Sequence, residues 1–291
     1  MKFAYMIMAH NEPYVLDKLI QMLDYPNNDI YIHVDAKSNL IDKRKLHTNS
    51  AGLVILPSRK LTWGGQSQIY VVLDLITEAL KTDHDYYHLI SGVDLPLKSN
   101  FDMVEFFERN KGKEFIGITP NWAESPAIAQ RYKLHWLFQD SIGKKKNILY
   151  LVSRIITKVE KYLGFKREKK EDIHFFGGPE WFSITEQATR YILSQGDWAI
   201  KRFRETICSD EIYAQTIIGN SAFAEKIYNK ESKDSYAECL RYVKFNRESP
   251  FVLTVNDYDN LVDSNFLFAR KFGSKTSDQK ELVDKIFELY K

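Results

Sequence analysis

The chain has 291 residues, of which 44% are hydrophobic and 27% are charged, and its formal net charge is +2. This composition is typical of a globular protein with a large core, and so small a net charge gives no sign of nucleic-acid binding. No apolar run approaches the roughly 18–20 residues that span a bilayer. Cys208 and Cys239 alone offer neither a disulfide framework nor a metal cluster.

Short apolar runs alternate with helical patterns through the first 120 residues. The expected strands are residues 3–8, 29–34, 53–56 and 86–90, and helices are expected at 15–23, 69–80 and 103–108. This β-α-β alternation predicts an α/β fold with a mostly parallel central sheet flanked by helices. The first apolar run lacks a small-residue cleavage site, so we interpret it as a strand rather than a signal peptide and expect a cytoplasmic protein.

Polar loops follow three of these strands, namely His10-Asn11-Glu12, Asp35-Ala36-Lys37 and Ser91-Gly92-Val93-Asp94. The carboxyl ends of parallel strands meet at one sheet edge, which is where α/β proteins bind nucleotides. The third loop is equally compatible with an ordinary turn. Neither a P-loop nor a dinucleotide-binding glycine motif is present, which leaves a nucleotide or sugar-nucleotide binder of another kind.

Residues 121–172 change character. The first part mixes charge with aromatic rings, which suits a polar, ring-shaped ligand, and it contains Trp122, Arg131, Lys133, His135 and Trp136. Residues 144–170 hold two basic clusters around an amphipathic helical pattern. One interpretation is a solvated helix with one face packed on the domain; the other is a basic helix resting on an anionic membrane surface.

The second half of the chain adds a candidate base. Residues 175–183 are expected to form an aromatic strand interrupted by a glycine pair, and Thr185 to cap the next helix. Ser209 is an expected N-cap that places Asp210 and Glu211 in a first helical turn. Carboxylates are favoured there by the helix dipole, and a carboxylate facing a cleft can also serve as a general base. A C-terminal helix is expected from about residue 279.

Seven segments, in order, resemble one family. They are His10-Asn11, residues 33–38 (His-Val-Asp-Ala-Lys-Ser), 63–67 (Trp-Gly-Gly-Gln-Ser), 91–97 (Ser-Gly-Val-Asp-Leu-Pro-Leu), 177–181 (Gly-Gly-Pro-Glu-Trp), 209–211 (Ser-Asp-Glu) with Thr216, and 267–272 (Leu-Phe-Ala-Arg-Lys-Phe). The chain is similar over residues 3–272 to glycosyltransferase family 14, the core-2/I-branching β-1,6-N-acetylglucosaminyltransferases and peptide O-xylosyltransferases, in a bacterial form.

The resemblance implies a GT-A-like single domain over residues 1–272, with a nucleotide-binding half at 1–120 and an acceptor half at 121–272. A basic helical insert would occupy about 140–172, and residues 273–291 would form the C-terminal helix. The implied reaction is an inverting, metal-independent transfer from a UDP-sugar to a glycan hydroxyl. We expect no cofactor, an acceptor that is a glycan or a lipid-linked oligosaccharide, no nucleic acid, and peripheral contact with the inner membrane surface.

The resemblance also implies roles for individual residues. Glu211 matches the catalytic base, Lys271 a diphosphate contact and Asp35 the nucleotide-binding segment. Arg247 is nearest to a second diphosphate contact, with Arg241 and Arg270 as alternatives. The remaining donor-side candidates are His10, Asn11, Lys37, Trp63, Ser91 and Asp94, and the acceptor-side candidates are Arg131, Lys133, Glu180, Trp181 and Asp210. Of the two tryptophans, Trp181 is favoured for stacking on a sugar face.

Two Asp-x-Asp strings, at 83–85 and 257–259, would suit a metal-dependent transferase, but the first precedes its strand and the second reads as a surface turn. Fixed cations from Lys271 and a nearby arginine can stabilise a departing diphosphate without a metal. The alternatives are a metal-dependent transferase and a non-catalytic protein that binds glycans or sugar nucleotides.

Overall fold

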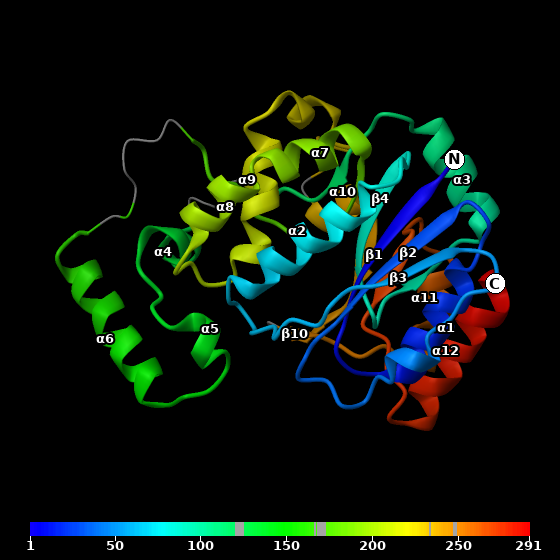
Figure 1. The fold of residues 1–291 in the computed structure, drawn as a ribbon, viewed down its shortest axis with the longest axis horizontal. Coiled ribbons are helices and arrows are strands. Elements are labelled where there is room, and N and C mark those ends of the chain that lie inside the picture. The colour runs from blue at the N-terminus through cyan, green and yellow to red at the C-terminus, as the bar shows by residue number, and fades with distance from the viewer. Residues whose placement is uncertain (120–124, 166, 168–172, 233, 247–248) are drawn as a thin grey trace.

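The computed structural model describes residues 1–119, 125–165, 167, 173–232, 234–246 and 249–291. Its central sheet has the strand order β3–β2–β1–β4–β7–β6 (Figure 1). The strands are β1 (Phe3–Ala9), β2 (Asn28–Val34), β3 (Gly52–Ile55), β4 (Tyr86–Ser91), β6 (Phe115–Ile116) and β7 (Phe182–Thr185). β1 to β4 are parallel, and β7 runs antiparallel to both of its neighbours, which confirms the mostly parallel sheet.

The sheet separates two hydrophobic cores. Because side chains alternate along a strand, Tyr5 and Ile7 of β1 face one core while Met6 and Met8 face the other. The first core is covered by α1 (Pro13–Leu23), α3 (Asn100–Arg109), α11 (Tyr258–Val262), α12 (Ser277–Tyr290) and two strands, β5 (Leu95–Pro96) and β11 (Phe268–Arg270). The second is covered by α2 (Ser67–Ala79), α7 (Glu186–Ser194), α8 (Gly196–Phe203) and α9 (Tyr213–Gly219).

Smaller elements complete the described chain. β11 lies between β5 and β8 (Arg241–Val243) in a three-stranded sheet, and β9 (Phe245–Asn246) pairs with β10 (Ser249–Pro250). The short helices are α10 (Ser235–Cys239) and the 3₁₀ turns η1 (Lys43–Lys45), η3 (Ser209–Glu211), η4 (Ala222–Lys226) and η5 (Val255–Asp257).

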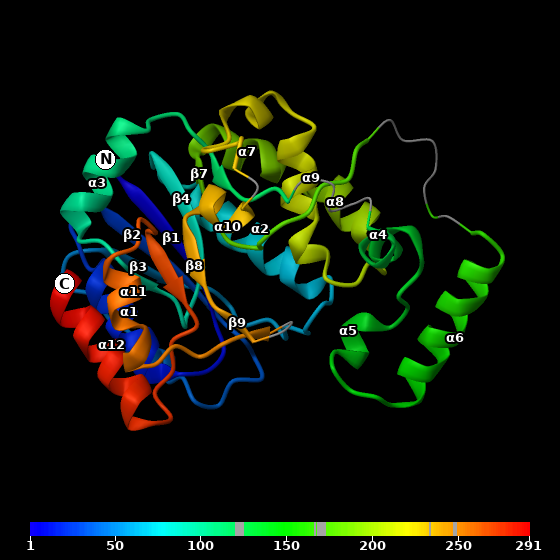
Figure 2. The same cartoon turned by 180° about the vertical axis from the view of Figure 1, so that it is seen from behind.

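A helical lobe stands at one side of the sheet, as expected for the added segment. It contains α4 (Pro126–Lys133), α5 (Gln139–Ile142) and α6 (Ile148–Tyr162). Both views place α6 at the outer end of this lobe, far from the C-terminus (Figures 1 and 2). Among the described helices, none combines the length and apolarity needed to cross a membrane.

Two expectations for the second half are wrong. Residues 175–181 are not a strand, because their polar groups pair with η3 and α9 instead of a neighbouring strand: the Gly178 amide donates to the Glu211 carbonyl, and the Gln215 side chain donates to the Pro179 carbonyl. Ser209 is not a helix N-cap. Cys208, in a left-handed conformation at φ 50°, precedes a single 3₁₀ turn, and α9 begins only at Tyr213.

Of two further local predictions, one is confirmed and one is wrong. Thr185 caps α7 by accepting a hydrogen bond from the Ala188 amide, as predicted. Asp257, expected in a surface turn, is buried: it pairs with Lys244 at 2.6 Å and closes a capping box with Thr254. Its burial follows from these bonds, which satisfy a carboxylate that would otherwise be costly to bury.

Candidate active site

The carboxyl ends of β1, β2 and β4 bring together residues that are far apart in the sequence. Asp35 follows β2, and its Oδ1 accepts hydrogen bonds from the amides of Lys37 at 3.0 Å and Leu61 at 3.2 Å. Asp94 follows β4, where β5 pairs with β11 and so places Arg270 and Lys271 at the same edge. The Phe272 amide donates to the Val93 carbonyl and holds this junction in place.

Arg270 is held from two sides. Its Nε lies 3.3 Å from Oδ1 of Asp94, and its guanidinium carbon lies 4.4 Å from the centre of the Trp181 ring. Asp94 is itself fixed, because it accepts hydrogen bonds from the amide and hydroxyl of Ser91. Ser91, Asp94 and Trp181 are all buried, so these three predicted site residues position Arg270 rather than reach into solvent.

The cations at this edge repel one another. The pKa of Lys271 is lowered by burial first, and then by the positive charges of Arg270 and Lys144. The pKa of His10 is lowered by burial and then by Lys271. Like charges that disfavour each other's charged form are relieved when an anion binds between them. The cluster of Arg270, Lys271 and Lys144, with His10 beside it, therefore has the electrostatics of an anion site.

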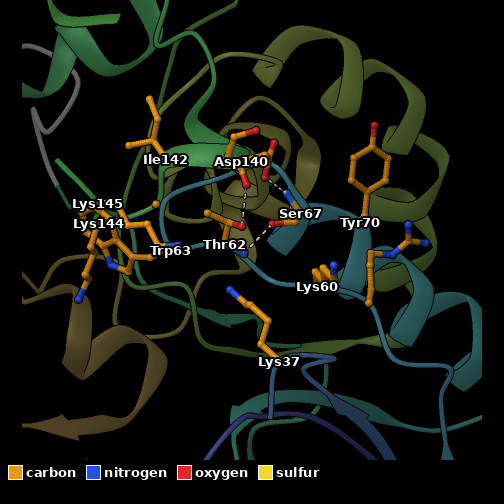
Figure 3. A pocket seen from close by; sticks show the side chains of 13 residues that line it. Lys37, Lys60, Thr62, Trp63, Ser67, Tyr70, Asp140, Ile142, Lys144 and Lys145 are labelled. Carbon is orange, nitrogen blue, oxygen red and sulfur yellow. Dashed lines mark hydrogen bonds between the residues drawn. The ribbon is translucent and has the colours of Figure 1, made fainter. Parts of the chain in front are cut away.

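A cavity of about 810 Å³ adjoins this cluster (Figure 3). Five cationic side chains and one carboxylate line it, namely Lys37, Arg59, Lys60, Lys144, Lys145 and Asp140. Trp63 also lines it, with 51% of its surface exposed and the Lys144 ammonium 4.9 Å from its ring centre. Two predicted donor residues, Lys37 and Trp63, thus share one cavity. Lys144 was not among the predicted site residues, because in the sequence it stands out only as part of a basic cluster next to an amphipathic helical pattern.

Asp140 joins the cavity to the glycine motif at residues 63–67. Its carboxylate accepts hydrogen bonds from the Ser67 amide at 3.0 Å and the Gln66 amide, at the start of α2. Gly65 has no room for a side chain, since an added Cβ would lie 2.3 Å from Asp140 Oδ1. In the first turn of α2, Gln68 donates to Asp210 Oδ2 at 3.0 Å. The motif therefore connects the cavity to the predicted base segment.

Three carboxyl groups gather at that segment. The Glu211 side chain is 43% exposed and accepts a 2.6 Å hydrogen bond from Arg131. Burial, followed by the charge of Glu211, raises the pKa of Asp210 to about 7. Burial, followed by the charge of Asp210, raises the pKa of Glu180 well above its usual value. Environments that separate neighbouring carboxyls in this way can divide acid and base roles between them.

The two clusters are adjacent. Glu180 precedes Trp181, on whose ring Arg270 lies, and the Arg270 charge opposes the rise in the pKa of Glu180. Within the described ranges, no three His, Cys, Asp or Glu side chains are placed to hold a metal ion. The site thus has a cationic side, a carboxyl side and a cavity that opens beside both.

The remaining candidates differ in their positions relative to this site. Arg241, an alternative diphosphate contact, is buried in the core, where it donates to the carbonyls of Cys239 and Phe182 and so does not reach the site. Arg247 lies outside the described residues. Lys133 ends α4, two residues after Arg131, and lies 5.6 Å from the Tyr132 ring centre. Asn11 is half-buried beside His10.

Residues 3–259 match the family model described as Branch: Core-2/I-Branching enzyme. The chain belongs to this family. Relatives include xylosyltransferase 2 of Rattus norvegicus, 24% identical over 99% of this chain, and xylosyltransferase 1 of Homo sapiens, 20% identical over 85% of it. These alignments cover 34% and 24% of the two relatives, so the chain spans about a third or less of their length.

Replacing Gly65 by alanine tests the close approach of Asp140. We expect the Gly65→Ala variant to lose about 1–3 kcal/mol of unfolding free energy, because the new methyl group overlaps the carboxylate. Urea unfolding measures the loss. In an Asp140→Ala background the same substitution should cost less; equal costs in both backgrounds would show that another contact requires the glycine.

Replacing Asp210 by asparagine tests the raised pKa. A carboxyl that titrates near pH 7 when folded, against 3.8 as its reference value, binds its proton more tightly in the folded state. Its contribution to stability is therefore present at low pH and is lost as pH rises through about 7. Asparagine cannot ionise, so the melting temperature of Asp210→Asn should exceed that of the parent by on the order of a few degrees above this pH, and the gap should shrink towards about pH 4.

The matched control for this experiment is Asp83→Asn, at a carboxylate that is almost fully exposed. It should leave the pH dependence of the melting temperature unchanged. A gap between Asp210→Asn and the parent that stays constant with pH would contradict the assigned titration.

Proposed function

We propose that the protein is an inverting, metal-independent glycosyltransferase that moves a sugar from a UDP-sugar to a glycan hydroxyl. The observation that carries this proposal is the placement of the crowded cations beside three carboxyls of unequal burial. Membership of the core-2/I-branching family supports the same reaction class.

On the donor side, the departing diphosphate would lie against Lys271 and Arg270. Breaking the anomeric bond places negative charge on this leaving group, and fixed cations stabilise that charge in the transition state. Asp94 and Trp181 hold the Arg270 guanidinium before substrate arrives, so little reorganisation is needed. The rest of the nucleotide would occupy the adjoining cavity, with Lys37 and Lys144 near the phosphates and the exposed Trp63 ring available for stacking.

On the acceptor side, Glu211 would take the proton from the attacking hydroxyl. It is the most exposed of the three carboxyls, and its second oxygen has no hydrogen-bond partner in the part of the chain that the structure describes. Arg131 orients the carboxylate through the first oxygen. Burial, followed by the charge of Asp210, raises the pKa of Glu180, and in its protonated form Glu180 can donate a hydrogen bond to a sugar oxygen or to Asp210.

The metal-dependent alternative has less support from the geometry. Asp85 precedes β4, at the opposite end of the strand from the site, and accepts a hydrogen bond from the Lys2 amide at 2.7 Å. Asp257 is committed to Lys244 and to its capping box. At the strand end where a metal-binding motif would stand, Asp94 is engaged by Ser91 and Arg270. Metal independence remains a prediction for experiment.

The names of the relatives suggest UDP-xylose as a donor, and the family description suggests UDP-N-acetylglucosamine. For the acceptor we propose a growing bacterial surface polysaccharide or a lipid-linked oligosaccharide, modified in the cytoplasm.

A non-catalytic sugar-nucleotide binder is disfavoured, because binding alone gives no role to an exposed carboxylate beside the cationic cluster.

Turnover of UDP-sugars tests the base. Glu211→Gln removes the proton acceptor while keeping the shape, so we expect transfer to fall by at least about 100-fold. The thermal shift induced by UDP should persist, since Glu211 does not contact the donor phosphates in this proposal. The exposed Glu231→Gln is the control and should retain activity. Binding of UDP-sugars by the parent protein without any transfer would favour the non-catalytic alternative.

A thermal-shift titration tests the anion site. UDP should raise the melting temperature in the presence of EDTA, because a ligand that binds only the folded state stabilises it. Lys271→Met should weaken UDP binding on the order of tenfold to a hundredfold, the loss of a charge-assisted contact. Lys275→Met, on an exposed neighbouring lysine, should bind normally. A shift that requires manganese would contradict metal independence.

A further inference from the structure

The amphipathic helix α6 turns its apolar face outward. Residues 148, 151, 152, 155, 159 and 162 recur every three or four positions and so share one face of the helix. All are large apolar or aromatic side chains, and their exposed fractions run from 38% at Val152 to 90% at Tyr162. Leu163 and Phe165 extend the exposed stripe beyond the last turn.

The opposite face of α6 is polar, and it is this face that packs on the protein. Ser153 and Thr157 are buried, and the Thr157 hydroxyl lies 2.8 Å from the Ser153 carbonyl within the helix and 3.2 Å from the His135 carbonyl, so its one proton is shared between the two. Glu160 accepts a hydrogen bond from the His135 amide at 2.8 Å and a second one from the imidazole. The orientation of the helix is thus set by specific bonds, and the apolar stripe is left facing solvent. This arrangement inverts the usual one for a surface helix.

Positive charges outnumber negative charges around the apolar stripe. Residues 139–165 contain six Lys and Arg but only two carboxylates, Asp140 and Glu160. Both carboxylates are already engaged, Asp140 at the start of α2 and Glu160 at His135. Lys145, Lys146, Lys158 and Lys161 remain exposed beside the apolar stripe. Within residues 139–165, the outward surface of the lobe therefore combines apolar side chains with exposed lysines.

We propose that α6 docks in the plane of an anionic lipid membrane. Such a surface accepts apolar side chains at the level of the acyl chains and lysines at the headgroups, which matches both features of the stripe. A second copy of the chain matches less well, because two stripes placed face to face would bring their lysines together. The outer position of α6 in both views leaves it accessible to a flat surface (Figures 1 and 2).

Docking would place the candidate active site at the membrane. Lys144 and Lys145 line the cavity, and Asn147, two residues later, caps α6 through its side chain. The same short loop therefore belongs to the cavity wall and leads into the docking helix. An acceptor attached to a lipid would reach the site without leaving the bilayer. The docking itself does not depend on the proposed transfer reaction.

Vesicle flotation tests this proposal with the full chain. The protein should float with phosphatidylcholine vesicles that contain phosphatidylglycerol, and at least about tenfold less with phosphatidylcholine alone. The double variant Ile155→Asp/Val159→Asp should lose at least about tenfold of its binding to the anionic vesicles, because it places charges in the apolar stripe. Both sites are solvent-exposed, so its melting temperature and UDP-induced shift should match the parent.

The matched control is Phe101→Asp, an exposed aromatic residue on α3. It should bind anionic vesicles as the parent does. Equal binding of Ile155→Asp/Val159→Asp and the parent would overturn the proposal, as would no binding of the parent. Light scattering adds a third outcome: a dimer that becomes a monomer in the double variant would assign the stripe to a second copy and overturn membrane docking. A parent protein that binds UDP but not vesicles would leave the proposed function standing.

Discussion

The contact on which the site depends most is the one between Asp94 and Arg270. It joins the segment that follows β4 in the central sheet to the end of β11 in the small sheet, so it connects residues that are far apart in the sequence. A buried ion pair is costly unless its polar atoms are satisfied, and Ser91 supplies hydrogen bonds to Asp94, whereas Nε of Arg270 lies within ion-pair distance of Asp94 without forming a hydrogen bond in the part of the chain that the structure describes. The pair fixes the guanidinium against Trp181, beside the carboxyl groups.

The charged groups of the site interact unfavourably with one another in the free protein. In the free protein, burial and then the charges of Arg270 and Lys144 lower the pKa of Lys271, and the neighbouring carboxyls Asp210 and Glu180 have raised pKa values. Neither arrangement contributes to stability, and both would be relieved by a ligand that brings negative charge to one side and hydroxyl groups to the other. This cost is the common cause behind the proposed binding of a sugar nucleotide and the pH-dependent stability. Groups with strongly shifted pKa values are typical of functional sites.

Burial separates residues that look equivalent in the sequence. Trp181 is favoured by its neighbours Gly177 to Glu180, yet it is 5% exposed and its ring is covered by Arg270, whereas Trp63 is the ring that lies open in the cavity. Arg241 and Arg270 are both alternatives for a phosphate contact, but Arg241 is enclosed by backbone carbonyls. The exposure of a side chain depends on which distant segments pack against it. A local sequence pattern therefore cannot predict which of these residues is exposed.

The sequence by itself determined the alternating elements of the sheet, the polar loops at its edge and the family, because strand and helix periodicities and ordered motifs are local properties of the chain. Only the tertiary structure decided the direction of α6. Its amphipathic pattern is plain in the sequence, but a periodic pattern defines two faces without saying which one meets the protein. The two hydrogen bonds that Glu160 accepts from His135, with the buried Ser153 and Thr157 beside them, settle that and turn the apolar face to the outside.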